Sequence, residues 1–204
     1  KLWDYDTGDM AISGKAAIAD IDGDDQPEVV IGAGSTSTPA SHGGLYVISH
    51  TGVLQCGFET ADFADDGWRD GVHSSPALAE LDFNDQGQLE IAFGAWDGWV
   101  RVLNHDCSVV WETFVRDSVW SSPAIGDLDE DGDPEIVIGV DSHIEPFYGT
   151  EDGGILHVYH HDGTELTGFP IQIDEVIFSS PALGDIDGDQ HLDIVVGTGR
   201  CWSD

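Results

Sequence analysis

The chain has 204 residues, 40% of them hydrophobic and 9% aromatic, with 40 Asp plus Glu against only 6 Lys plus Arg. This apolar content is enough for a folded core, which excludes a disordered chain, and the formal net charge of −34 repels nucleic-acid phosphates and anionic lipid head groups. No apolar run approaches the roughly 18 residues of a membrane-spanning helix, so we expect neither a nucleic-acid partner nor membrane insertion.

One short phrase occurs four times and sets the organisation of the chain. It closes on an acidic residue that advances from Asp20 to Glu80, Asp127 and Asp185, and three copies contain Ser-Pro-Ala, beginning at Ser75, Ser122 and Ser180. A period of roughly 50 to 60 residues exceeds that of helical solenoids and suits a four-stranded propeller blade.

Short apolar runs follow each phrase and predict the next strands of each blade. A third strand follows in the complete copies and ends at a turn that leads into a fourth, while no segment shows the 3.6-residue period of an amphipathic helix. The sequence therefore predicts an all-β fold of four-stranded blades. The predicted second strands are 29–31, 91–93, 136–138 and 194–196, the third strands are 45–48, 100–103 and 156–159, and the turns are 51–52, 106–107 and 162–163.

The ends of the chain are expected to lie within blades. Trp3 precedes Asp20 much as Trp111 precedes Asp127, so residues 2–5 are predicted to be the last strand of an earlier blade. Because propellers usually close with about four to eight blades, we interpret the chain as a single partial β-propeller of about three and a half blades within a larger ring. The alternative is that the N-terminal strand completes the final blade. The expected divisions are 1–13, 14–73, 74–120, 121–178 and an incomplete 179–204.

Three loops between first and second strands carry acidic or polar residues at positions 1, 3, 5, 7 and 9. Ca²⁺ takes six to eight oxygen ligands, and a tight loop whose alternate side chains point inward can supply them, with a backbone carbonyl at position 7. An EF-hand also needs a Glu at position 12, where this chain has Ile31, Ile138 or Val196. We predict about three calcium ions, a plain Asp/Gly turn being the alternative for any single loop. The predicted ligands are Asp20, Asp22, Asp24, Gln26, Glu28, Asp127, Asp129, Asp131, Asp133, Glu135, Asp185, Asp187, Asp189, His191 and Asp193.

The corresponding loop of the second blade departs from this pattern. It is longer and has fewer carboxylates, so we expect weak binding of a fourth ion or none. Its candidate ligands are Glu80, Asp82, Asn84 and Glu90.

With these loops, the chain resembles the FG-GAP (VCBS-type) repeat family, the calcium-binding blades of integrin α-subunit propellers and of many secreted microbial proteins. The resemblance covers nearly the whole chain and rests on the D-x-D-G-D-type loops at Asp20, Asp127 and Asp185, each followed by a β-branched strand. It implies calcium on one propeller face, an extracellular or cell-surface location, and a role in adhesion or ligand recognition. The Ser-Ser-Pro-Ala phrase is closer to microbial surface proteins, so integrin partners are not implied.

The face opposite the metal loops is the predicted binding face. Because strands alternate in direction, it receives the long connections 34–43, 59–73 and 141–153, and loops of this length are often functional. A protein or carbohydrate ligand, or another copy of the chain, is the expected partner, and ordinary loop packing is the alternative. The predicted residues are His42, Trp68, Arg69, Trp96, Phe147 and Tyr148.

No catalytic motif emerges, because among so many acids some pair always looks plausible. We expect a module that is not an enzyme. The alternatives are an acidic surface-layer or filament component, and the non-catalytic portion of a propeller enzyme such as a polysaccharide lyase. Cys56, Cys107 and Cys201 make an odd count, which leaves their pairing open. His50, His105 and His161 recur before the third turn and are expected to flank turns.

Overall fold

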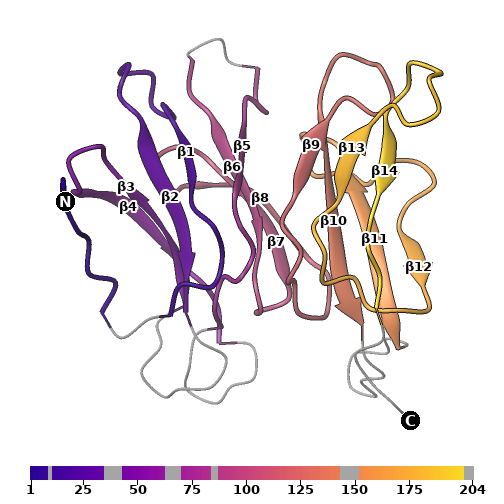
Figure 1. Ribbon diagram of the computed structural model, residues 1–204, viewed down its shortest axis with the longest axis horizontal. Coiled ribbons are helices and arrows are strands. Elements are labelled where there is room, and N and C mark those ends of the chain that lie inside the picture. Colours follow the sequence, from indigo (N-terminus) through magenta and orange to yellow (C-terminus); the bar gives the residue numbers. More distant parts are fainter. Residues whose placement is uncertain (9–10, 35–42, 63–69, 84–86, 143–151, 200–204) are drawn as a thin grey trace.

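The computed structural model describes residues 1–8, 11–34, 43–62, 70–83, 87–142 and 152–199. Within these ranges the chain forms fourteen β-strands and no helix, arranged as three four-stranded antiparallel sheets and one two-stranded sheet (Figure 1). No helix in the described part of the chain could cross a membrane. The all-β prediction of about three and a half blades is confirmed.

Consecutive strands are neighbours in every sheet, as in the meander of a propeller blade. The first sheet contains β1 (Ala17–Ala19), β2 (Glu28–Ala33), β3 (Gly44–Ile48) and β4 (Leu54–Glu59). The second contains β5 (Ala77–Ala79), β6 (Glu90–Gly94), β7 (Trp99–Leu103) and β8 (Val109–Phe114). The third contains β9 (Ala124–Gly126), β10 (Glu135–Ser142), β11 (Gly153–Tyr159) and β12 (Ile171–Ile173), and β13 (Ala182–Gly184) pairs with β14 (Asp193–Val195).

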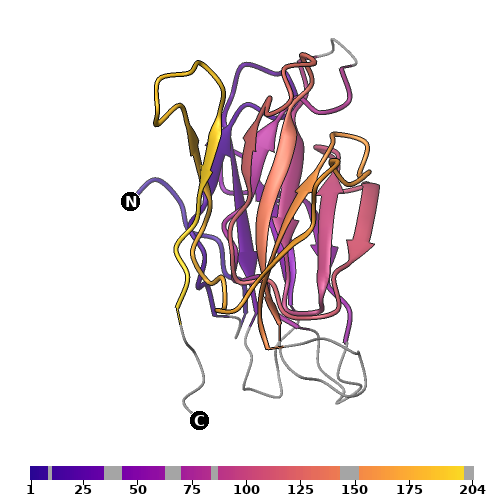
Figure 2. The same ribbon diagram turned by 90° about the vertical axis from the view of Figure 1, so that its right-hand side faces the viewer.

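The four sheets share one register. The alanine of each repeated phrase pairs with the same position of the next strand, in the pairs Ala17↔Val30, Ala77↔Ala92, Ala124↔Val137 and Ala182↔Val195. The first strands of successive sheets contact one another, β1 with β5, β5 with β9 and β9 with β13, so they line a common edge (Figures 1 and 2). The second strands are almost wholly buried between the sheets.

The two serines of the repeated phrase explain how adjacent sheets are held. The second serine accepts a backbone N–H from the preceding sheet: Lys15 N to Ser75 Oγ at 2.8 Å, Ser75 N to Ser122 Oγ at 2.8 Å, and Ser122 N to Ser180 Oγ at 3.2 Å. The first serine bonds to its own sheet, as Ser74 Oγ does to the carbonyl of Gly94 at 2.7 Å. The phrase is therefore a hydrogen-bonding element that links each sheet to the next.

Neighbouring units make a second contact, which we call the interblade joint. In it, a side chain of one unit packs on the turn between the third and fourth strands of the next unit. Trp3 Nε1 donates to the carbonyl of His50 at 2.8 Å, and its ring lies where a Cβ on Gly52 would stand 2.8 Å away. Trp111 repeats both contacts one unit later, donating to the carbonyl of His161 at 2.9 Å and covering Gly163 in the same way. Only glycine leaves room for an indole this close to the turn.

The joint between the first and second sheets is built differently. Cys56 occupies the position of Trp111, since Cys56 pairs with Val47 as Trp111 pairs with Val102. Cys107 takes the place of the turn glycine and has the same left-handed backbone, with φ 65° against 85° at Gly52. The two cysteines form a disulfide. The pairing that the sequence left open is thus between Cys56 and Cys107.

The N-terminal strand expected at residues 2–5 is not among the strands of the described part of the chain. Residues 2–5 form no ladder with another strand in the described part of the chain, and the earlier blade with which they were expected to pair is not in this sequence, so their assignment as a last strand stays a prediction. Trp3 nevertheless occupies the joint position of Trp111. The matching spacing of Trp3 and Trp111 thus reflects a shared packing position.

Candidate functional site

The metal loops and the turns between third and fourth strands lie at the same end of the sheets (Figure 1). In the loop 20–28, Asp20 accepts the backbone N–H groups of Gly23 at 2.8 Å and Asp25 at 2.8 Å through its two oxygens. Asp185 repeats this in the loop 185–193, accepting from Gly188 at 2.7 Å and Gln190 at 2.9 Å. The first aspartate thus curls each loop around its own carboxylate.

The ninth residue of each loop closes it from the second strand. One of its oxygens accepts the backbone N–H of position 2: Glu28 from Ile21 at 3.1 Å, Glu135 from Leu128 at 2.7 Å, and Asp193 from Ile186 at 2.9 Å. This bond turns the second carboxylate oxygen toward the acids of the same loop. In the first and last loops, acids from positions 1, 3 and 9 therefore lie together.

Glu28 is the most informative of these residues. It is 0% exposed, and its Oε1 has no hydrogen-bond partner among the described residues. The ligand atoms of Glu28, Asp20 and Asp22 lie within 4.8 Å of one another. Burial raises the pKa of Glu28, and the nearby carboxylates of Asp22, Asp24 and Asp20 raise it further, against the opposing effect of the Ile21 N–H. Because a buried unpaired carboxylate is costly, this cluster has the chemistry of a cation site.

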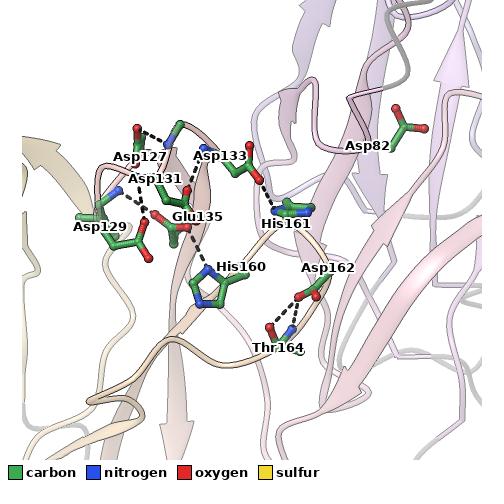
Figure 3. A network of polar contacts seen from close by, with 12 residues as sticks. Asp82, Asp127, Asp129, Asp131, Asp133, Glu135, His160, His161, Asp162 and Thr164 are labelled. Atoms are coloured by element: carbon green, nitrogen blue, oxygen red, sulfur yellow. Dashed lines mark hydrogen bonds and ion pairs between the residues drawn. The ribbon is translucent and has the colours of Figure 1, made fainter.

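The loop 127–135 brings its acids together in a different way (Figure 3). Asp127, Asp129 and Asp131 form one group, and Asp129 and Glu135 form a second group with His160. His160 Nδ1 lies 3.2 Å from the Oε1 of Glu135, so an imidazole contacts the oxygen that is unpartnered in Glu28. Oxygen donors still dominate this loop, which fits a hard divalent cation.

The structure groups some of the predicted ligands and not others. Asp185, Asp187 and Asp193 form the group of the last loop, with acids at positions 1, 3 and 9 as in the first. In the first and last loops position 5 lies outside the group and accepts the N–H of position 7, as Asp24 does from Gln26 at 2.8 Å and Asp189 from His191 at 2.9 Å. The side chains at position 7 point to other partners: Gln26 to the carbonyl of Asp25, Asp133 to His161, and His191 to Glu130.

The second-blade loop also gathers three carboxylates, from Glu80, Asp82 and Glu90. Glu90 is 1% exposed, and its Oε2 accepts the N–H groups of Leu81 at 2.6 Å and Asp82 at 3.2 Å. Burial raises the pKa of Glu90. Asn84 lies outside the described residues. The longer loop thus keeps the three-acid arrangement of its neighbours, and weak ion binding there stays a prediction.

Of the predicted binding face, the structure describes Trp96; the other five residues, His42, Trp68, Arg69, Phe147 and Tyr148, lie outside the described ranges. Trp96 belongs to the short hairpin between β6 and β7, which the buried Arg101 fixes through two bonds to Asp97, at 2.9 and 2.7 Å. The ring of Trp96 lies 5.0 Å from that of Trp120 and 5.7 Å from that of His73.

These rings are part of an aromatic cluster that the sequence analysis missed. His73 stacks on Trp120 at 5.2 Å, and Trp120 contacts Phe178 at 5.6 Å. His73, Trp120 and Phe178 each directly precede the two serines of the repeated phrase, so the repeat itself places one ring per sheet at this edge. Phe178 remains 41% exposed. The sequence does contain this pattern, because a ring precedes the two serines in each of these repeats, but the pattern is seen only when the repeats are aligned with one another.

Acidification is expected to destabilise the protein through His73. Burial lowers the pKa of His73 below its ordinary value of 6.5. In the window below that value, the unfolded chain takes up a proton that the folded chain resists, so stability falls as the pH falls. His73→Phe keeps an aromatic ring and removes the titration. Urea unfolding between about pH 7.5 and pH 5.5 should show a smaller loss for the variant; parallel losses in both proteins would contradict this role.

Comparisons with known proteins agree with this architecture. The FG-GAP repeat family model matches residues 119–159, and a search of curated proteins found no match. The solved V. cholerae biofilm matrix protein Bap1 is similar at 18% identity and TM-score 0.48, over 95% of this chain and 37% of that one. The Pseudomonas aeruginosa PilY1 C-terminal domain is similar at 15% identity and TM-score 0.51, over 74% and 39%.

A third solved structure, BBS1N in complex with ARL6DN, is similar at 13% identity and TM-score 0.50, over 92% of this chain and 63% of that one. The chain thus spans less than two thirds of each of these structures. The likeness to PilY1 and BBS1N concerns the fold. The matched segment 119–159 contains β9, β10, β11 and the loop between β9 and β10. The chain is built from propeller-type β-blades, and residues 119–159 match the FG-GAP repeat family model.

Proposed function

We propose that this chain is a calcium-binding, extracellular β-propeller module that serves adhesion or ligand recognition and is not an enzyme. The observation that carries the calcium assignment is the buried, unpartnered Oε1 of Glu28, which is grouped with Asp20 and Asp22. Comparable three-acid groups recur in the loops 127–135 and 185–193. About three ions would neutralise local repulsion in the loops, where each would be held by oxygen donors.

Two features support an extracellular location. The disulfide joins residues of different sheets, and disulfides persist mainly in oxidising compartments. The net charge of −34 keeps such a surface soluble and repels polyanions. A protein or a neutral carbohydrate is therefore the proposed ligand.

The aromatic cluster of His73, Trp96, Trp120 and Phe178 is the proposed centre of the recognition face. Trp96 Nε1 and both ring nitrogens of His73 have no hydrogen-bond partner among the described residues. Aromatic faces stack on sugar rings or anchor a protein loop, and ring N–H groups can donate to hydroxyls or carbonyls. These nitrogens are buried within the cluster, so what it offers a ligand is apolar ring area, including the exposed ring of Phe178.

Binding to arrays of neutral glycans, anionic glycans and extracellular proteins tests this proposal. We expect binding in calcium to a neutral glycan or a protein, and its loss in Trp96→Ala. Phe83→Ala is the matched control, since Phe83 is a 43% exposed aromatic residue of a metal-face loop and should retain binding. Equal loss in both variants would remove the face assignment.

Absence of binding to every array would instead favour the structural alternative, an acidic filament or surface-layer component. Light scattering against protein concentration, with and without calcium, separates the two. A calcium-dependent assembly supports the component, and a monomer under both conditions supports the recognition module.

A further inference from the structure

The joint between the first and second sheets has no aromatic ring at the position that the indole of Trp111 fills in the next joint. In the other two joints an indole covers a glycine and donates its N–H to a backbone carbonyl, of His50 or His161. At the joint of Cys56 and Cys107 the disulfide replaces both the indole and the glycine. Because a disulfide is smaller than an indole, part of the volume that the indole ring occupies in the other joints is free for a ligand here.

A cavity is present at this place. Its volume is about 240 Å³, and it is lined by Asp22, Gln55, Cys56, His105 and Asp106. By the shared register these residues correspond to Asp82, Val110, Trp111, His161 and Asp162 at the next joint. Since an apolar cavity of about 150 Å³ accepts benzene, this one has room for a two-ring system.

At this joint a sulfur takes the place of the indole N–H that donates to the turn carbonyl in the other joints. Cys56 Sγ lies 3.5 Å from the carbonyl oxygen of His105, the position that receives an indole N–H in the other joints. A disulfide sulfur carries no hydrogen, so this contact supplies no donor. A ligand that places an aromatic N–H here would restore the missing bond.

The charge of the residues that line the cavity favours cationic aromatic ligands over anionic ones. Asp106 contributes a carboxylate that is not one of the proposed calcium ligands, and it accepts two hydrogen bonds from Ser108, from its N–H at 3.0 Å and its hydroxyl at 2.5 Å. These bonds favour the ionised form of Asp106. With a net charge of −34, the protein attracts cationic ligands and repels anionic ones.

We propose that this cavity binds an indole that carries a cationic amine, with the ring N–H donating to the carbonyl of His105 and the ammonium group beside Asp106. The site is separate from the recognition face, which lies at the opposite end of the sheets, and it does not depend on the ligand of that face. The indolylamine can be a free small molecule or a tryptophan next to a lysine in a peptide.

Calorimetric titration with tryptamine, in saturating calcium, tests the proposal. We expect one saturable site per chain, with indole-3-acetate binding at least tenfold more weakly because its charge is reversed. Asp106→Asn should weaken tryptamine binding severalfold while leaving the affinity for neutral indole unchanged. A Trp-Lys dipeptide amide distinguishes the sources: binding tighter than that of tryptamine assigns the site to peptides, and weaker binding assigns it to free amines.

Filling the cavity is the decisive control. The double substitution Cys56→Trp and Cys107→Gly rebuilds the indole joint and should abolish tryptamine binding. Should that protein not fold, Gln55→Trp fills the cavity from its exposed rim and keeps the disulfide. Binding that persists in a folded, filled variant, or equal affinity for tryptamine and indole-3-acetate, overturns the proposal.

Discussion

Saturating calcium is expected to stabilise the chelator-treated protein strongly. Three ions, each at about one hundred times its dissociation constant, would add roughly 8 kcal/mol to the free energy of unfolding. For a chain of this length that corresponds to an increase in Tm of roughly 15 °C or more. Thermal unfolding with calcium added back, together with calorimetric counting of bound ions, checks the size of the effect and the number of sites.

Glu28→Gln separates calcium binding from loop packing because its two expected effects have opposite signs. The folded pKa of Glu28 is raised, so in the metal-free protein its ionisation at neutral pH costs stability, and the neutral amide removes that cost. The same substitution removes a carboxylate ligand from the first loop. The variant should therefore be more stable than the unaltered protein in chelator, and gain less from calcium.

A matched charge change elsewhere serves as the control. Glu59→Gln alters an exposed residue of β4 and should change neither the ion count nor the calcium response. Magnesium, which prefers a smaller octahedral site, should stabilise far less than calcium. If calcium produced no shift and no ion bound, the loops would be acidic turns, and the calcium assignment would fall.

Removal of the disulfide is expected to have the second largest effect. Cys56 and Cys107 are 51 residues apart, and closing a loop of that size stabilises by up to about 4 kcal/mol in the chain-entropy model. Cys56→Ala with Cys107→Ala should therefore lower the free energy of unfolding by about 2–4 kcal/mol. Urea unfolding in a Cys201→Ser background, which prevents exchange with the third thiol, measures this loss.

The indole joint supplies the comparison. Cys56→Trp with Cys107→Gly replaces the covalent link with the packing seen at Trp111 and Gly163, and should recover part of the stability lost in the double alanine variant. If the double alanine variant were as stable as the unaltered protein, the disulfide would have no structural role at this joint. If the indole variant were no better than the alanine variant, Cys56 would not be equivalent to Trp111.

Local patterns in the sequence were enough to predict the strands. The apolar run after Asp20, for example, could only be a buried strand, and the register that pairs Ala17 with Val30 follows from the repeat. The candidate loops were found for the same reason, since each loop takes its acids from nine consecutive residues. The grouping of Glu28 with Asp20 and Asp22 required no distant partner.

Features assembled from different repeats were harder to predict. Cysteine spacing alone says nothing about pairing, and Cys56 meets Cys107 because one stands at an indole position and the other at a turn-glycine position. The cluster of His73 and Trp120 likewise takes one ring from each sheet. The place of Trp3 likewise depends on a distant segment, since it is set by the carbonyl of His50 and the space above Gly52.

The serine bonds between sheets have a consequence for how such chains change in length. Each sheet offers a hydroxyl such as that of Ser122 to the unit before it, and an N–H such as that of Ser122 to the unit after it. Donor and acceptor come from the same residue at Ser75 and Ser122, whereas the first unit supplies only the N–H of Lys15. The serine bonds would therefore re-form after gain or loss of a whole unit, whereas the interblade joint would re-form only where an indole again meets a glycine or a cysteine meets a cysteine.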